Sequence, residues 1–474
     1  MRSARRLTTC GWAALGLAAA SATAACDDGP TAPPAVTVDA GTDLGPAPDD
    51  GAVTDARPGD VPAVDVPPEP YDAGPAPACD RSPTWSRVGE RDPLVQTLEP
   101  GGVVAYRGGF VVAVRQSAPR TPVVDAGAPD AGELDAGADA GPRRRDTIDL
   151  LTLDANGEVQ RPLATVYASA PSASDLSTPT LARLGDGAVV LFRESRGLPG
   201  AEGFTTRVQS VLVDNAGVAG NAAPLIDEQS DPFVTNLPDG TPFGVSTRLV
   251  RRLDGGVIVA APNSFRVAPG GTLVSPGLID LTRYLPLSAT SVLLRPRPEG
   301  AALVFKVGAD LQTVRFDAQG VVDPRSPRVT PNVNPPRLDD AAVVNDAVIA
   351  AWAEGFDLTR SVVRVLVAGA SGAVIARADL ERVEGDPPWV GVAPIWGGAA
   401  VLWVRGSGEG AVLRGVRVQP DGVVAGSPVD LVPVPGAQGR LALVSEGRQI
   451  VFTARADREG TAGVGFGRVC FPAM

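Results

Sequence analysis

A strand–turn–strand pattern recurs along this chain about every fifty residues. An apolar run leads into a short turn that ends in glycine, and a second apolar run follows the turn. The turn glycines, spaced 60, 54, 49, 52 and 50 residues apart, are Gly157, Gly217, Gly271, Gly320, Gly372 and Gly422. A period of this length that contains only strand signals is typical of a β-propeller.

A second recurring element lies between these turns, a hairpin whose second strand is apolar without interruption. These apolar runs are residues 110–114, 188–192, 257–261, 301–305, 348–352, 399–403 and 449–452. They predict strands buried on both faces, as the inner strands of a propeller blade are, because the neighbouring blades cover them. Strands that precede the glycine turns alternate instead, which predicts half-exposed outer strands.

Seven such hairpins predict an all-β fold, a single propeller of seven four-stranded blades over residues 79–474, with six or eight blades as alternatives. The final strand, residues 463–469, is expected to supply an outer strand of the closing blade. Trp352, Trp396 and Trp403 lie on inner hairpins and are expected in the core.

The first 25 residues have the pattern of an export signal. Arg2, Arg5 and Arg6 precede an apolar stretch over residues 7–22, and small residues follow up to Cys26. This stretch is too short for a spanning helix. Cys26 after small residues resembles a bacterial lipobox, in which the cysteine is acylated; ordinary cleavage after Ala24 or Ala25 is the alternative.

Residues 26–78 predict a disordered tether. Residues 27–78 hold 12 prolines and 11 acidic residues against the single Arg57, with almost no large apolar side chains. Such a segment cannot bury enough surface to offset its ordering entropy. With the signal and the repeats, the chain resembles an exported bacterial lipoprotein that carries a divergent β-propeller. The resemblance implies a protein anchored by its lipid in the cell envelope, at the outer membrane or the periplasmic face.

Two cysteines bracket the part expected to fold. Cys79 follows the tether and Cys470 lies four residues from the end. In an exported protein, and in a closed propeller whose termini meet in one blade, this placement predicts a disulfide between them. Two unpaired thiols are the alternative.

The chain has a formal net charge of −12 and contains no histidine. The charge argues against nucleic acid as a partner. The missing histidine excludes histidine-based triads and histidine metal sites. We expect no cofactor and no metal, and we expect a monomer.

One insertion interrupts the repeats at residues 117–146. It contains Asp125, Asp130, Asp135 and Asp139, but their spacing is not that of an EF-hand or of a calcium-binding nonapeptide repeat. We therefore expect a disordered low-complexity loop.

The meander predicts where a ligand would bind. The short glycine turns fall on one face of the ring, which should be functionally quiet, and the long connections fall on the other. Those long connections span residues 194–206, 227–244, 281–289, 332–340 and 384–389. The candidate binding residues within them are Asp227, Glu228, Asp231, Arg283, Tyr284, Arg337, Asp339, Asp340, Asp386 and Trp389.

Three classes of function are compatible with these residues. The favoured one is a tethered binding module for a polysaccharide or a protein partner, with no catalytic residues. A carboxylate-dependent glycan-acting enzyme is the second, with Asp231 and Asp386 as candidates, because glycoside hydrolysis uses paired carboxylates. A structural component of the envelope is the third. The Asp-box motif of sialidases is absent from the turns.

Overall fold

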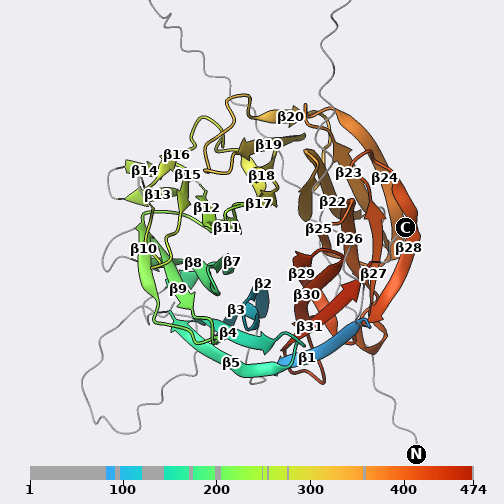
Figure 1. The fold of residues 1–474 in the computed structure, drawn as a ribbon, viewed down its shortest axis with the longest axis horizontal. Coiled ribbons are helices and arrows are strands. Elements are labelled where there is room, and N and C mark those ends of the chain that lie inside the picture. Colours follow the sequence, from blue (N-terminus) through green and yellow to red (C-terminus); the bar gives the residue numbers. More distant parts are fainter. Residues whose placement is uncertain are drawn as a thin grey trace, which may run out of the picture. The chain divides into compact units, whose positions relative to one another are not determined.

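The computed structural model describes residues 82–90, 97–119, 144–169, 174–197, 204–247, 249–253, 256–274, 277–355 and 359–471. These residues form seven antiparallel blades around a central axis (Figure 1). The chain is thus an all-β, seven-bladed propeller, as the repeat predicts. The signal peptide, the tether and residues 120–143 of the insertion lie outside the described residues.

The first three blades run in chain order. The strands of blade 1 are β2 (Thr97–Tyr106), β3 (Gly109–Pro119), β4 (Arg144–Asp154) and β5 (Val159–Ala168). The strands of blade 2 are β6 (Ser174–Leu176) and β7 (Thr180–Leu184), which both pair with β8 (Gly187–Gly197), then β9 (Phe204–Val213) and β10 (Ala223–Asp227). The strands of blade 3 are β11 (Pro232–Asn236), β12 (Pro242–Ser246), β15 (Asn263–Arg266) and β16 (Ile279–Asp280).

The next three blades are regular four-stranded meanders. The strands of blade 4 are β17 (Ala289–Arg297), β18 (Gly300–Val307), β19 (Asp310–Phe316) and β20 (Arg328–Thr330). The strands of blade 5 are β21 (Asp340–Val344), β22 (Ala347–Gly355), β23 (Arg360–Ala368) and β24 (Val374–Glu384). The strands of blade 6 are β25 (Val390–Ile395), β26 (Gly398–Arg405), β27 (Val412–Val418) and β28 (Val424–Pro433), with a 3₁₀ turn η1 (Gly408–Gly410).

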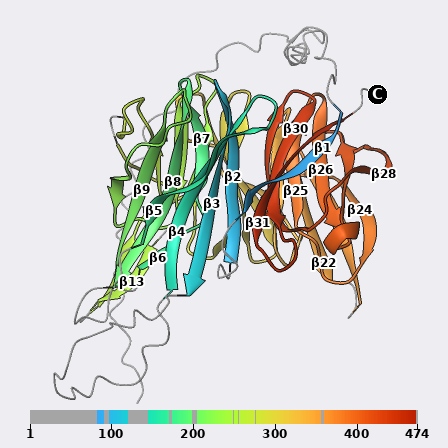
Figure 2. The same ribbon diagram turned by 90° about the horizontal axis from the view of Figure 1, so that it is seen from below.

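Both ends of the folded chain contribute to blade 7. Its strands are β29 (Ala437–Glu446), β30 (Gln449–Ala456), β31 (Gly463–Cys470) and β1 (Thr84–Glu90). The N-terminal strand β1 is outermost and pairs with β31, which closes the ring (Figure 2). The Trp85 ring on β1 stacks on that of Phe452 at 5.4 Å between centroids. The last strand of the chain is an outer strand of the closing blade, as predicted.

The closing blade also bears on the predicted disulfide. Thr84 pairs with Arg468, so the chain end at Cys470 lies beside the start of β1. Cys79 itself lies outside the described residues. The pairing of Cys79 with Cys470 therefore stays a prediction.

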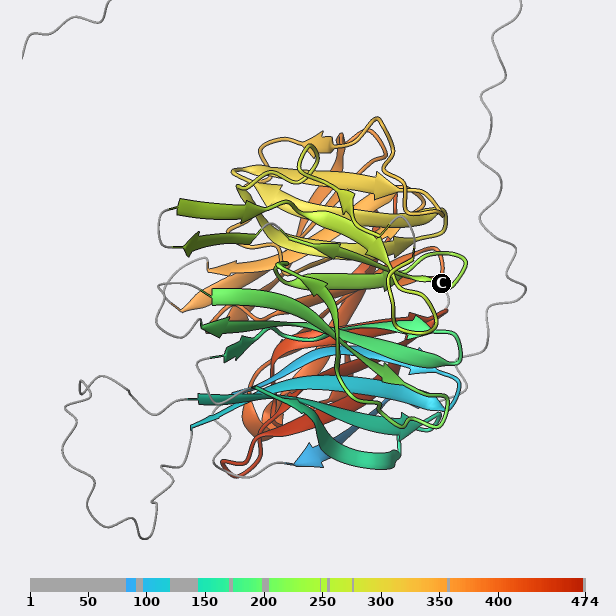
Figure 3. The ribbon, with the colours of Figure 1, turned by 90° about the vertical axis from the view of Figure 1, so that its left-hand side faces the viewer.

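The core of the described chain is divided among the interfaces between blades. It contains seven buried apolar clusters, and each joins two neighbouring blades. The second strands are buried on both faces, since Val111 to Val114 on β3 are all 0% exposed. Outer strands such as β5 and β24 are mostly exposed, as the alternating sequence predicts. Figure 3 shows one side of the ring, on which neighbouring blades lie next to one another.

The recurring glycine turns have one geometry. Each glycine has a positive φ, between 74° and 89°, and donates its amide to the residue three positions earlier. Where that residue is aspartate, its carboxylate accepts two further amides of the turn, as Asp154 does from Asn156 at 2.7 Å and Glu158 at 2.8 Å. These hydrogen bonds explain why aspartate and glycine recur at this spacing.

Blade 3 departs from the sequence-based assignment. The apolar run at residues 257–261 was expected to be its inner strand, but it belongs largely to a separate hairpin of β13 (Leu249–Leu253) and β14 (Gly256–Ala260). The inner hairpin is instead β11 and β12, which lies largely in the segment predicted as a long loop at 227–244 and extends to Ser246. The error has a physical cause: these two strands are short and carry prolines, which favour loops in sequence-based reasoning. The β13–β14 hairpin lies at the same rim as β6 (Figure 2).

Two smaller expectations also need correction. Trp352 and Trp403 are buried as predicted, but Trp396 lies in the turn between β25 and β26 and is 57% exposed. The insertion is shorter than 117–146, because β3 extends to Pro119 and pairs there with Arg144. Among the described residues, no helix is long and apolar enough to cross a membrane.

Candidate functional site

The inner strands of the propeller surround a cavity of about 490 Å³ on the central axis. Residues of β2, β7, β11, β17, β25 and β29 line it, and so does Asp340 at the start of β21. Much of the lining is backbone and aliphatic side chain. The charged residues that face it are Asp231, Arg295, Asp340 and Arg440. Inner strands start at the long-connection face. Asp231, Asp340 and Arg440 lie near the starts of inner strands and therefore near that end of the cavity, whereas Arg295 lies near the end of β17.

Two arginines, Arg295 and Arg440, line the cavity. Among the described residues, Arg295 pairs with Asp340, whereas Arg440 has no carboxylate partner. Its side chain is exposed to the cavity, yet protein surrounds it on nearly every side, because it projects from an inner strand of a closed ring. Burial lowers the pKa of Arg440; the nearby charge of Asp340 opposes that change and Arg295 adds to it. An arginine in this setting stays charged and can bind an anionic group.

Two adjacent carboxylates, Asp339 and Asp340, join blades 4, 5 and 6 at the long-connection face. Asp340 accepts hydrogen bonds from Arg295 of β17, at 3.1 Å from Nε, and from the amide of Val392 on β25 at 2.8 Å. Asp339 accepts the amides of Ala353 at 3.1 Å and of Val390 at 3.3 Å. Burial raises the pKa of Asp339, although pairing with Arg337 opposes the rise.

Arg337 and Trp389 form a stacked platform beside these carboxylates. The Arg337 guanidinium lies 4.1 Å from the centre of the Trp389 ring. Asp339 and the carbonyl of Pro388, the latter at 3.0 Å, hold the guanidinium in place. Trp389 is 38% exposed, so part of its ring faces solvent. A cation held over an indole gives a rigid surface that loses little entropy on binding.

On blades 1 to 3 the charges at this face form a continuous network. Arg115 of β3 contacts Asp146 and Asp175, both at 2.9 Å, and Glu99 at 3.8 Å. Arg193 of β8 continues it, with Asp175 at 2.9 Å and Asp231 at 2.8 Å. The network links the starts of three inner strands. Its carboxylates are therefore neutralised by arginine.

The structure distributes the remaining candidate residues over different places. Asp227 ends the outermost strand of blade 2 and pairs with Arg207, away from the cavity. The guanidinium of Arg283 lies 5.9 Å from the ring centre of Tyr284, in the connection from β16 to β17. The exposed Asp386 lies in the connection from β24 to β25 and does not line the cavity, whereas Asp231 does.

Of the predicted residues, the structure thus brings Arg337, Asp339 and Trp389 together. Sequence reasoning missed Arg440, Arg295 and the arginines of the network. Arg440 had a weak signal, a lone charge directly before the apolar run at 441–444. The others lie on strands whose spatial neighbours come from other blades. Among the described residues, no three acidic, cysteine or histidine side chains are placed to hold a metal.

The pairing of the cavity's carboxylates limits the acid–base chemistry that they can perform as they stand. Retaining glycosidases need a second free carboxylate close to the first, and inverting ones need a pair that leaves room for water. Asp231, Asp339 and Asp340 are each held by an arginine. The face presents a fixed aromatic platform, a cavity and Arg440, which has no carboxylate partner in the described part of the chain.

Neither a protein-family model nor a curated protein sequence matches this chain. Several solved propeller structures resemble it. A xylan β-1,4-xylosidase from Bacillus halodurans has a TM-score of 0.31 at 10% identity, covering 81% of this chain and 92% of that one. An arabinoxylan arabinofuranohydrolase from Bacillus subtilis has 0.31 at 11%, covering 82% and 97%. A Trypanosoma rangeli sialidase has 0.33 at 10%, covering 82% and 57%. At these values the likeness carries no inference about activity.

Proposed function

We propose that this chain is a binding module, tethered to the cell envelope, that recognises an acidic polysaccharide at the long-connection end of its central cavity. The carrying observation is Arg440, a guanidinium without a carboxylate partner in the described chain, in a cavity walled by inner strands. A carboxylate of a uronic acid would supply the missing partner. A planar guanidinium matches a carboxylate through two parallel hydrogen bonds.

The Arg337–Trp389 platform supports the same ligand class. An indole ring presents a flat apolar face on which the C–H face of a sugar ring can pack, while the guanidinium supplies hydrogen-bond donors. Asp339 connects the platform to the cavity. It accepts a hydrogen bond from Arg337, and its charge raises the pKa of Arg440. A polymer lying across the platform could thus place an acidic group at the cavity.

The tether gives the proposal its cellular setting. Lipidation at Cys26 would anchor the chain, and residues 27–78 would space the propeller from the membrane. The anchor is tested by Cys26→Ser, which should move the protein from the membrane fraction to the soluble fraction. Equal membrane association of Cys26→Ser and wild type would refute lipid anchoring at this residue.

Binding is tested with the chain from Asp27 onwards, which lacks only the signal and the acylated cysteine. We expect affinity electrophoresis to show retardation in polygalacturonate and none in neutral dextran. Arg440→Gln should weaken retention at least about tenfold, because it removes a charge-assisted hydrogen bond. Trp389→Ala should weaken it as well. Trp396→Ala is the matched control, an exposed tryptophan on the opposite face.

Two outcomes would redirect the assignment. Equal retention of wild type and Arg440→Gln would refute the cavity as the site. New product masses after incubation with the polymer would favour the alternative of a carboxylate-dependent glycan-acting enzyme. The search would then turn to Asp231, whose side chain is 45% exposed at the cavity.

A further inference from the structure

A second pocket, of about 720 Å³, lies between blades 4 and 5 at the short-turn face, opposite the proposed polysaccharide site. Blade 4 forms most of it through an extra excursion of the chain. In blade 5 the outer strand begins at Val374, directly after the glycine turn, whereas in blade 4 it begins only at Arg328. The additional residues 323–327 carry a second turn, in which Asp323 accepts the amide of Arg325 at 2.9 Å. The excursion brings basic residues to the side of β19.

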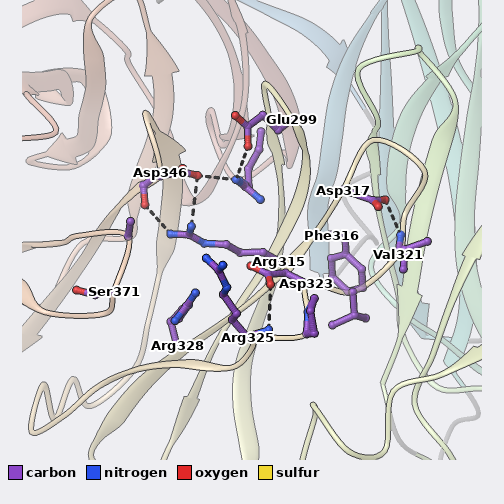
Figure 4. A pocket seen from close by; sticks show the side chains of 14 residues that line it. Glu299, Arg315, Phe316, Asp317, Val321, Asp323, Arg325, Arg328, Asp346 and Ser371 are labelled. Atoms are coloured by element: carbon purple, nitrogen blue, oxygen red, sulfur yellow. Dashed lines mark hydrogen bonds and ion pairs between the residues drawn. The ribbon is translucent and has the colours of Figure 1, made fainter. Parts of the chain in front are cut away.

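Four arginines converge on this pocket (Figure 4). Arg315 of β19 and Arg297 of β17 form its floor, with side chains only 8% and 7% exposed. Arg325 lies on the excursion and is exposed, and Arg328 at the start of β20 is half-buried, so both are more accessible than the two floor residues. No ion pair involves Arg325 or Arg328 among the described residues. Two buried and two accessible guanidinium groups therefore face one concave space.

Four carboxylates, those of Glu299, Asp317, Asp323 and Asp346, also line the pocket, but among the described residues none of them forms an ion pair with Arg325 or Arg328. Asp346 is shared, since its carboxylate pairs with Arg297 and lies 3.5 Å from Arg315. Asp317 turns its carboxylate to the amides of its own turn, each at 2.9 Å. Glu299 contacts Arg297 at 3.3 Å but is 77% exposed. These carboxylates are thus directed to Arg297, to Arg315 or to their own turns, which leaves the guanidinium groups of Arg325 and Arg328 without an ion pair among the described residues.

The guanidinium groups of the pocket also repel one another, as the environment of Arg315 shows. Burial lowers the pKa of Arg315; Asp346 and Asp323 raise it, and the charges of Arg297 and Arg328 lower it. An anion placed among the guanidinium groups would relieve that repulsion.

We propose that this pocket binds a phosphoryl group. A phosphate presents several oxygens around one centre, which suits guanidinium groups that approach from different strands. Ser371, on the wall from blade 5, adds a hydroxyl that can donate to the same ligand. The phosphoryl group could be that of a soluble phosphate ester or of a lipid headgroup. The site is independent of the polysaccharide face and requires no property of it.

The test uses the chain from Asp27 onwards and three probes: inorganic phosphate, glycerol 3-phosphate and phosphatidylglycerol vesicles. Isothermal titration calorimetry covers the soluble probes, and co-sedimentation covers the vesicles. The double variant Arg325→Gln/Arg328→Gln should lose at least about tenfold in affinity, since each guanidinium supplies a charge-assisted hydrogen bond. Arg183→Gln is the matched control: it removes an exposed arginine from the same face on blade 2, outside the pocket.

The outcomes separate the sources of the ligand. Binding of a soluble probe that the double variant weakens and Arg183→Gln preserves would support a soluble phosphate. The same pattern with vesicles alone would support a lipid headgroup. Failure of wild type to bind any probe, or equal loss in both variants, would overturn the proposal. If the double variant does not fold, the exposed single substitution Arg325→Gln decides in its place.

Discussion

Replacing Asp340 with alanine should destabilise the propeller far more than replacing a surface aspartate that also pairs with arginine. The Asp340 side chain is 10% exposed and pairs with Arg295, which is itself 23% exposed. Its carboxylate also accepts the Val392 amide at 2.8 Å. Alanine would remove the carboxylate partner of a largely buried guanidinium, which keeps only the carbonyls of Leu294 and Ala341, and it would leave the buried Val392 amide without its acceptor.

The size of the effect follows from those contacts. Breaking a buried ion pair from one side costs roughly 3–5 kcal/mol, and an unsatisfied buried amide costs roughly 1–3 kcal/mol. Because Arg295 can recover some hydration, we expect a loss of about 3 kcal/mol. The matched control is Asp379→Ala. Asp379 pairs with Arg364 at 2.9 Å but is 56% exposed, so its loss should cost less than about 1 kcal/mol.

Urea denaturation followed by tryptophan fluorescence measures both values, because the midpoint shifts at constant slope when stability alone changes. Asp340→Asn should lie between alanine and wild type, since its amide oxygen can still accept one hydrogen bond. If Asp340→Ala and Asp379→Ala lowered the free energy of unfolding by amounts within about 0.5 kcal/mol of each other, the structural role assigned to Asp340 would be refuted. A stabilising effect would point instead to a strained functional carboxylate.

Three further predictions concern ring closure and titration. Trp85→Ala should lower the free energy of unfolding by about 2 kcal/mol, since it removes a half-buried ring stacked on Phe452; an unchanged urea midpoint would contradict closure through the N-terminal strand. Burial raises the folded-state pKa of Asp339, so the folded protein binds the proton more tightly than the unfolded chain. Wild type should therefore gain stability relative to Asp339→Asn as pH falls from about 7 to about 4, and a difference independent of pH would count against this assignment. Reduction of the predicted Cys79–Cys470 disulfide should cost ~5 kcal/mol, and a non-reduced digest without the linked peptide would remove that prediction.

The architecture could be predicted because local signals repeat with the blades. Aspartate and glycine at a fixed spacing specify a turn whose hydrogen bonds involve only neighbouring residues, as at Asp154 and Gly157. Uninterrupted apolar runs specify strands covered on both faces, as at 110–114. The same reasoning failed where a strand is short and forms only through its pairing with another strand. Strand β11 is short, begins with Pro232 and holds its place through pairing with β12, which no local pattern reveals.

The candidate site was predictable only in part, for a related reason. The long connections identified Arg337, Asp339 and Trp389, which lie within two stretches of sequence that meet in space. Arg295 gave no signal and Arg440 only a weak one, because what distinguishes each of them is its position relative to residues of other blades. Charge type is visible in a sequence, whereas charge pairing depends on which blades are neighbours.

Charge pairing also explains why arginine, rather than aspartate, marks the proposed sites of this acidic protein. With a net charge of −12, the chain has more carboxylates than cationic groups. Most of the carboxylates at the long-connection end form ion pairs with arginine, and these pairs join strands and blades. A carboxylate at the long-connection end therefore does not by itself indicate a ligand-binding site. Among the described residues, Arg440 and Arg328 each lie in a concave site without a carboxylate partner. In a chain with an excess of carboxylates, such an arginine is unexpected. Because anions are what such groups bind, the two faces of the propeller should both select negatively charged ligands, one as a polymer and the other as a phosphoryl group.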